Sequence, residues 1–249
     1  MINLVKGDLR RIIKKKGFWI ALICILAFVV LLAITQRFVS WNGYAYIYTV
    51  QQQVTLYTLI LSTLIFLGVY GDEFRAMAMT CAIGRGVSRN RLIISKLIDN
   101  IILSVILFGI FAIEAVIAGL IMGAGMTSEE TFALVLYIMI GAVKSVGYTS
   151  IASIILFVNA NIPIGVFVLL VLHMIMPIVI NTASSSSKLL SSLHLDRWFF
   201  GGMVESGYSS IVLGMTAGGI MTLVLGCVIY IGISVGVTIA LFSKREMDF

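Results

Sequence analysis

The chain contains six apolar segments, each long enough to cross a lipid bilayer as an α-helix. They cover roughly residues 18–36, 54–71, 97–123, 132–158, 162–183 and 212–242. About 20 apolar residues are needed for one helical span, because the backbone must satisfy its own hydrogen bonds inside the bilayer. Only 11% of the residues are charged, against about 25% in soluble domains. The sequence therefore predicts an all-α, polytopic membrane protein that forms one transmembrane domain over residues 1–249.

The basic residues predict how the spans are oriented. Most of the 17 Lys and Arg residues fall before the first span, between spans 2 and 3, or after span 6. Because basic residues accumulate on the cytoplasmic side, we expect both termini in the cytoplasm of a cell with the protein in its plasma membrane. This placement also accounts for the high pI of about 9.3, so we expect no nucleic-acid partner. Residues 184–211 then form an extracellular segment, in which we expect an interfacial or re-entrant helix.

Two basic segments on the cytoplasmic side have further structure. Residues 1–16 alternate apolar and basic positions with helical spacing, which predicts an amphipathic helix on lipid of the inner leaflet. It serves either as a topology anchor only or as an elbow helix that helps to seat a cytoplasmic partner. In residues 72–91 we expect a short helix over 74–83 that stops at Gly84, followed by Ser88 as the N-cap of span 3. A helix from 89 to 123 would be about 50 Å long, so its start must project into the cytoplasm as a connector or a docking site.

Charged side chains inside the spans are candidates for function. Glu114 and Lys144 lie about 14 and 18 Å from the outer ends expected for spans 3 and 4. We expect Glu114 to face Lys144, to face a wet translocation path with direct substrate contact, or to stay protonated. In span 5, Pro177 should kink the helix and free a carbonyl near His173, which is a weaker candidate.

Three segments resemble the ABC-2 type permease family. They are "DLRRIIKKKGFWI" before span 1, the helix–Gly–"VSRNRLIISK" unit after span 2, and "LFSKREMDF" after span 6. Among relatives, the chain looks most similar to short six-span bacterial permeases of peptide export and lantibiotic immunity, such as the phenol-soluble modulin exporter permease. The resemblance implies a non-enzymatic permease subunit that pairs with a second permease copy, or a related permease, and with an ATP-binding cassette ATPase. It implies a cytoplasmic coupling helix whose docking residues are Phe74, Arg75, Met77, Met79, Gly84, Arg85, Ser88 and Arg89.

The chain carries no motif that would supply energy itself. It has no G-x-x-x-x-G-K-[ST] phosphate loop and no H-E-x-x-H metal site. We therefore expect no cofactor or metal in this chain, with ATP and Mg²⁺ in the partner ATPase. The expected function is ATP-driven export of amphipathic peptides or other membrane-partitioning molecules by alternating access. The alternatives are an ion-coupled secondary carrier with Glu114 as its proton site, and a membrane anchor or sensor subunit.

Overall fold

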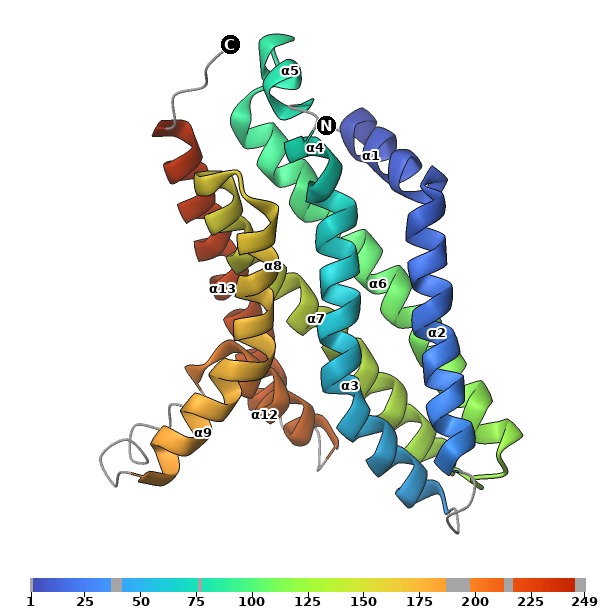
Figure 1. The fold of residues 1–249 in the computed structure, drawn as a ribbon. Helices are drawn as coiled ribbons and strands as arrows, with labels where there is room; N and C mark the ends of the chain where they lie inside the picture. The colour runs from blue at the N-terminus through green and yellow to red at the C-terminus, as the bar shows by residue number, and fades with distance from the viewer. Residues whose placement is uncertain (1, 37–41, 76–77, 187–197, 213–216, 245–249) are drawn as a thin grey trace.

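The computed structural model describes residues 2–36, 42–75, 78–186, 198–212 and 217–244, and all secondary structure in these ranges is helical (Figure 1). The helices are α1 (Ile2–Lys14), α2 (Lys16–Gln36), α3 (Gly43–Phe66), η1 (Leu67–Gly71), α4 (Asp72–Arg75), α5 (Ala78–Gly84), α6 (Arg89–Ile121), α7 (Ser128–Asn159), α8 (Ile162–Leu170), η2 (Val171–Ile175), α9 (Met176–Ser186), α12 (Phe200–Val212) and α13 (Ala217–Lys244). The segments η1 and η2 are single turns of π-helix. The all-α prediction is confirmed.

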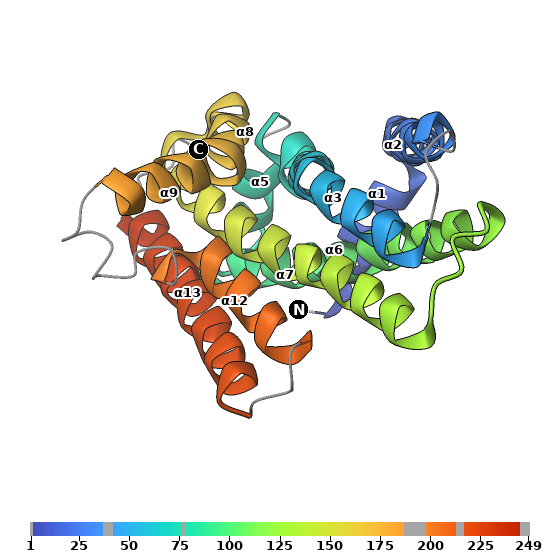
Figure 2. The same cartoon turned by 90° about the horizontal axis from the view of Figure 1, so that it is seen from below.

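Five helical stretches are long and apolar enough to cross a membrane. They are Gly43–Gly71, Arg89–Ile121, Ser128–Asn159, Ile162–Ser184 and Met221–Ser243. They coincide with predicted spans 2 to 6, as expected for a polytopic membrane protein. The segment predicted as span 1 is the 21-residue helix α2, which stands at the edge of the bundle beside α3 (Figure 2).

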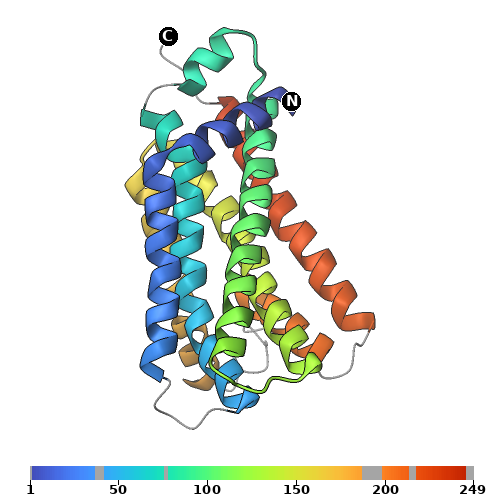
Figure 3. The ribbon, with the colours of Figure 1, turned by 90° about the vertical axis from the view of Figure 1, so that its right-hand side faces the viewer.

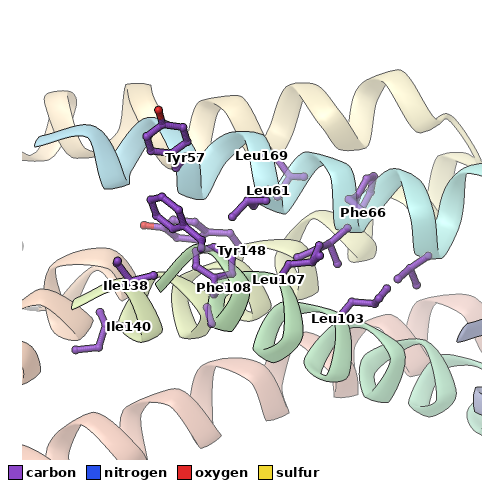
Figure 4. Packing of buried hydrophobic residues seen from close by; sticks show 14 of the residues in the cluster. Tyr57, Leu61, Phe66, Leu103, Leu107, Phe108, Ile138, Ile140, Tyr148 and Leu169 are labelled. Carbon is purple, nitrogen blue, oxygen red and sulfur yellow. The ribbon is translucent and has the colours of Figure 1, made fainter. Parts of the chain in front are cut away.

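The helices α3, α6 and α7 form the centre of the bundle. Their buried aromatic and aliphatic side chains interdigitate between the three axes (Figure 4). Helices α6 and α7 run antiparallel, and Asn100 Nδ2 donates a hydrogen bond to Thr149 Oγ1 across their interface. Two turns further along, a Cβ on Gly141 would lie 2.7 Å from the Phe108 ring, so this close approach requires glycine. These two contacts fix the register in which the long helices pack.

One end of the bundle gathers α1, α4, α5 and the carboxyl end of α13 (Figures 1 and 3). Helix α1 crosses this end from α2 to α6, and its Asp8 accepts a 2.5 Å ion-paired hydrogen bond from Lys96. Lys15 donates to Asp72 at 2.7 Å and so ties the start of α2 to α4. The expected helix within residues 1–16 is present, and charged contacts join it to the bundle.

Large apolar side chains cover the outside of several helices. Exposed examples on α13 recur at helical spacing, among them Met221, Val224, Leu225 and Val228. In water such a continuous apolar surface would be costly, whereas in a bilayer it meets lipid chains.

Candidate functional site

A cavity of about 670 Å³ lies among α3, α7, α9 and α12. This volume is typical of small-molecule sites. Helices α9 and α12, which line this cavity, lie toward the end of the bundle away from α5 (Figure 1). It is lined by Val54, Thr55 and Thr58 of α3; Tyr137, Ile140, Gly141, Lys144 and Tyr148 of α7; His173, Met174, Pro177, Ile178, Ile180 and Asn181 of η2 and α9; and Phe199, Gly201, Gly202, Glu205, Ser206 and Ser209 beside and along α12.

Two of the predicted site residues, Lys144 and His173, line this cavity together. Lys144 forms an ion pair and hydrogen bond with Glu205 of α12. The Lys144 side chain is 15% exposed, whereas that of Glu205 is 56% exposed. The cation is therefore withdrawn into the wall, and the carboxylate is the charge that remains accessible.

His173 sits on the π-turn η2, directly before the bend between α8 and α9. Pro177 has no N–H to donate to the His173 carbonyl, which explains why helical bonding changes here, as expected from the sequence. The His173 Nδ1 lies 2.9 Å from the Leu169 carbonyl oxygen. Because a carbonyl only accepts, Nδ1 carries the proton of a neutral ring. Nε2 lies 3.3 Å from Ser62 Oγ, whose own proton is donated to the Thr58 carbonyl. His173 is thus a buried, hydrogen-bonded residue that also packs against the Tyr148 ring, at 4.5 Å between centroids.

Helix α12 is held against α7 by one tight aromatic contact. The Phe200 ring lies over Gly147, where a Cβ would approach within 2.0 Å of a ring carbon. The Tyr208 hydroxyl donates to the Ala133 carbonyl and accepts from Gln51 of α3. Burial raises the pKa of Tyr208 above its ordinary value, although the Gln51 hydrogen bond acts in the opposite direction. These contacts place Glu205 opposite Lys144.

The structure does not bring Glu114 and Lys144 together. Helix α7 begins at Ser128, where Thr127 and Glu130 form a capping box. This start lies four residues before the apolar run at Phe132. Lys144 is therefore 16 residues from the start of α7, and Glu114 is seven residues from the end of α6. The register fixed by Asn100 and Thr149 separates the two residues by about 14 Å along the bundle axis.

Glu114 instead faces aromatic side chains of α3. Its carboxylate interacts electrostatically with Tyr46 and Tyr57. Within the described part of the chain, neither Glu114 Oε2 nor the Tyr57 hydroxyl has a hydrogen-bond partner. The predicted ion pair with Lys144 is wrong. The expectations of a wet path or a protonated carboxyl stay predictions.

Residues 72–91 contain two short helices, α4 and α5, and residues 76–77 between them are outside the described ranges. Helix α5 ends at Gly84, but the left-handed residue of its C-terminal motif is Gly86, with φ of +89°. Val87 N–H donates to the Ala82 carbonyl and Gly86 N–H to the Ile83 carbonyl, which defines a Schellman motif. Ser88 is the N-cap of α6 as predicted, although its side chain makes no capping hydrogen bond.

The residues predicted to dock a partner have different surroundings. Phe74 packs against Phe157 of α7, with 5.5 Å between ring centroids. Arg89 donates to the carbonyls of Phe242 and Ser243 and so caps the end of α13. Both side chains therefore stabilise contacts between helices of this chain. Gly84, Arg85 and Ser88 are exposed, whereas Met77 and the side chains of Arg75 and Met79 are outside what the structure describes.

Sequence reasoning missed two charged residues that the structure makes important. Glu205 stands alone in "FFGGMVESGY", and an acidic residue in an apolar stretch could have identified it as a partner for Lys144. Lys96 belongs in sequence to the basic residues between spans 2 and 3, but its side chain is 2% exposed and ion-paired with Asp8. Among the described residues, no group of three His, Cys, Asp or Glu side chains is arranged to hold a metal ion.

Comparison with protein-family models and with curated protein sequences gives no match to this chain. The likeness to ABC-2 permeases therefore rests on the sequence segments described above.

Proposed function

We propose that this chain is the membrane subunit of an ATP-driven exporter and that a separate cassette ATPase drives it. The substrates would be amphipathic peptides or other molecules that partition into the membrane. The functional unit would contain two permease copies, each with six spans, α2 being the first, and α1 as an elbow helix on the inner leaflet. Both termini would be cytoplasmic in a bacterial plasma membrane. ATP and Mg²⁺ would bind in the partner.

The observation that carries this proposal is the position of α5. It extends beyond the bundle at the end that also holds α1 and the carboxyl end of α13 (Figure 3). Cys81, Gly84 and Arg85 are exposed there. A helix that protrudes from a membrane bundle and exposes a basic side chain is suited to contact a soluble partner.

The start of α6 connects this protruding helix to the rest of the bundle. Arg89 binds the last turn of α13, and Lys96 binds Asp8 of α1. A force applied at α5 would therefore reach α1, α6 and α13 together. Helix α6 is 33 residues long, or about 50 Å, so it would carry the displacement across the membrane.

The test requires a candidate cassette ATPase from the same cell, such as one encoded beside this gene if the genome carries it there. We expect the two proteins to co-purify, and Arg85→Glu to weaken the complex because it reverses an exposed charge on the docking surface. Lys16→Glu is the matched control, since Lys16 is an exposed basic residue at the start of α2, outside both α5 and the elbow helix α1. Uphill accumulation of peptide by the purified chain alone, without nucleotide hydrolysis, would contradict the proposal.

An ion-coupled carrier is the second candidate, because Glu114 Oε2 is buried without a hydrogen-bond partner among the described residues. Such a carboxyl can exchange a proton during transport. In proteoliposomes, substrate-dependent proton flux that is lost in Glu114→Gln would favour the carrier, and substrate transport without proton flux would exclude it.

A further inference from the structure

We propose that the cavity among α3, α7, α9 and α12 binds cationic amphiphiles, with an ammonium group on Glu205 and an apolar chain along α9. This site goes beyond the proposed export function, since equilibrium binding to it requires neither the ATPase nor transport.

Three hydroxyl groups that line the cavity offer only acceptors to a ligand, and the donor Lys144 beside them is paired with Glu205. Ser206 Oγ donates its proton to the Met203 carbonyl, and Ser209 Oγ donates to the Ser206 carbonyl. Thr58 Oγ1 likewise donates to the Val54 carbonyl. Each hydroxyl has thus committed its donor to the backbone and offers only lone pairs to the cavity. An ammonium group brings three donors and no acceptor, so it complements these three hydroxyls.

The accessible carboxylate of Glu205 also favours a cationic ligand. Glu205 is 56% exposed, and its contact with Lys144 uses Oε1. On α12, Gly202, Glu205, Ser206 and Ser209 follow at spacings of three and four residues, so they share one face toward the cavity. A cation at this face meets a carboxylate and two hydroxyl oxygens, whereas an anion would have to displace Glu205 to reach Lys144.

The rest of the wall is apolar. Val54, Ile140, Met174, Ile178 and Phe199 line the cavity, and Met174 and Ile178 lie on the α9 side. An alkyl or aromatic body attached to the ammonium group would bury its surface against them. A hydrophilic cation such as a free amino acid lacks that body, so the site selects amphiphiles.

The experiment measures binding of dodecylamine, which is protonated at neutral pH, to the full chain in nanodiscs of zwitterionic lipid. Isothermal titration calorimetry against empty nanodiscs separates saturable binding from partition into lipid. Dodecanoate and dodecanol have the same chain with an anionic or uncharged head. We expect saturable binding of dodecylamine only, and about tenfold weaker binding to Glu205→Gln, which loses the charged acceptor.

Two further variants separate ligand binding from a structural role of the ion pair. Lys144→Met removes the internal cation that competes for Glu205, so we expect it to bind dodecylamine more tightly than the wild type. Glu129→Gln, at an exposed carboxylate outside the cavity, should bind as the wild type does. Equal binding of the three dodecyl compounds to the wild type would overturn the proposal, even if Glu205→Gln failed to fold. Weaker binding to folded Lys144→Met would overturn it too, because a purely structural pair would be damaged equally from either side.

Discussion

Replacement of Gly147 by Ala should push α12 away from α7. The added Cβ would lie 2.0, 2.2 and 2.9 Å from three carbons of the Phe200 ring. Carbon atoms are in favourable contact at about 3.5–4.0 Å, so the ring would have to move by about 1.5–2 Å. It has little room, because it is 1% exposed and packs against Tyr148 and Tyr230 at centroid distances of 5.6 and 5.3 Å.

The magnitude follows from two opposing effects. Overpacking of a close-packed interior costs about 1–3 kcal/mol, and the size of the shift places Gly147→Ala near the upper end. Exchange of Gly for Ala inside a helix contributes about 1 kcal/mol in the favourable direction. The net destabilisation is about 2 kcal/mol. For a chain of this size, that corresponds to a Tm about 4–8 °C lower.

Gly109→Ala is the matched control, because Gly109 lies inside α6 and a Cβ there meets nothing within 4 Å. Only the helix preference changes, so we expect its Tm to rise by about 2–4 °C. The assay is thermal unfolding of both variants in the same detergent or nanodisc, followed by intrinsic fluorescence. A Tm for Gly147→Ala at or above that of Gly109→Ala would refute the close packing of α12 on α7, and with it the position of Glu205.

Three further variants test other contacts. Lys96→Met should destabilise by about 3–5 kcal/mol, because it removes the cation that Asp8 and the fully buried Asp99 share; the additional change Asp99→Asn should recover part of this loss in the same unfolding assay, and an additive loss would contradict the pairing. Thr127→Ala removes the capping box with Glu130 and should cost about 1 kcal/mol, seen as faster amide exchange in the first turn of α7 and unchanged exchange elsewhere. Arg89→Ala should speed exchange in the last turn of α13, where it leaves two carbonyls without their donor; unchanged exchange there would show that this contact does not hold the turn.

The long apolar helices could be predicted because a bilayer imposes one simple requirement on each span. The residues at which these helices begin and end could not be predicted from the length of the apolar segment. Helix α3 begins at Gly43, well before the predicted residue 54, because Asn42 caps it and its first turns include polar positions such as Gln51. Helix α7 begins at Ser128 for the same reason. Hydropathy measures which residues suit lipid, whereas capping and hydrogen bonding decide where a helix begins.

The cavity was predictable only in part. Lys144 and His173 stand out as polar residues in apolar spans, and they line it. Glu205 lies on α12, and the position of α12 depends on the packing of Phe200 against Gly147. No local sequence pattern predicts that contact. Similarly, the resemblance to ABC-2 permeases implies a docking role for Arg89, but no local pattern indicates its contact with the end of α13. The carbonyls that it binds lie more than 150 residues away in the chain.

The separation of Glu114 from Lys144 makes the competing functions distinguishable by mutation. Lys144 is ion-paired with Glu205 and lines the cavity. Glu114 instead lies near Tyr46 and Tyr57, on the α3 side of α6. Because about 14 Å of helix lies between them along the axis, a change at one should leave the other nearly unaffected. Glu205→Gln should therefore reduce ammonium binding without altering any proton flux, and Glu114→Gln should do the reverse. If both variants changed both readouts, the two sites would share one path, and the assignment of ligand binding to the α12 cavity alone would be wrong.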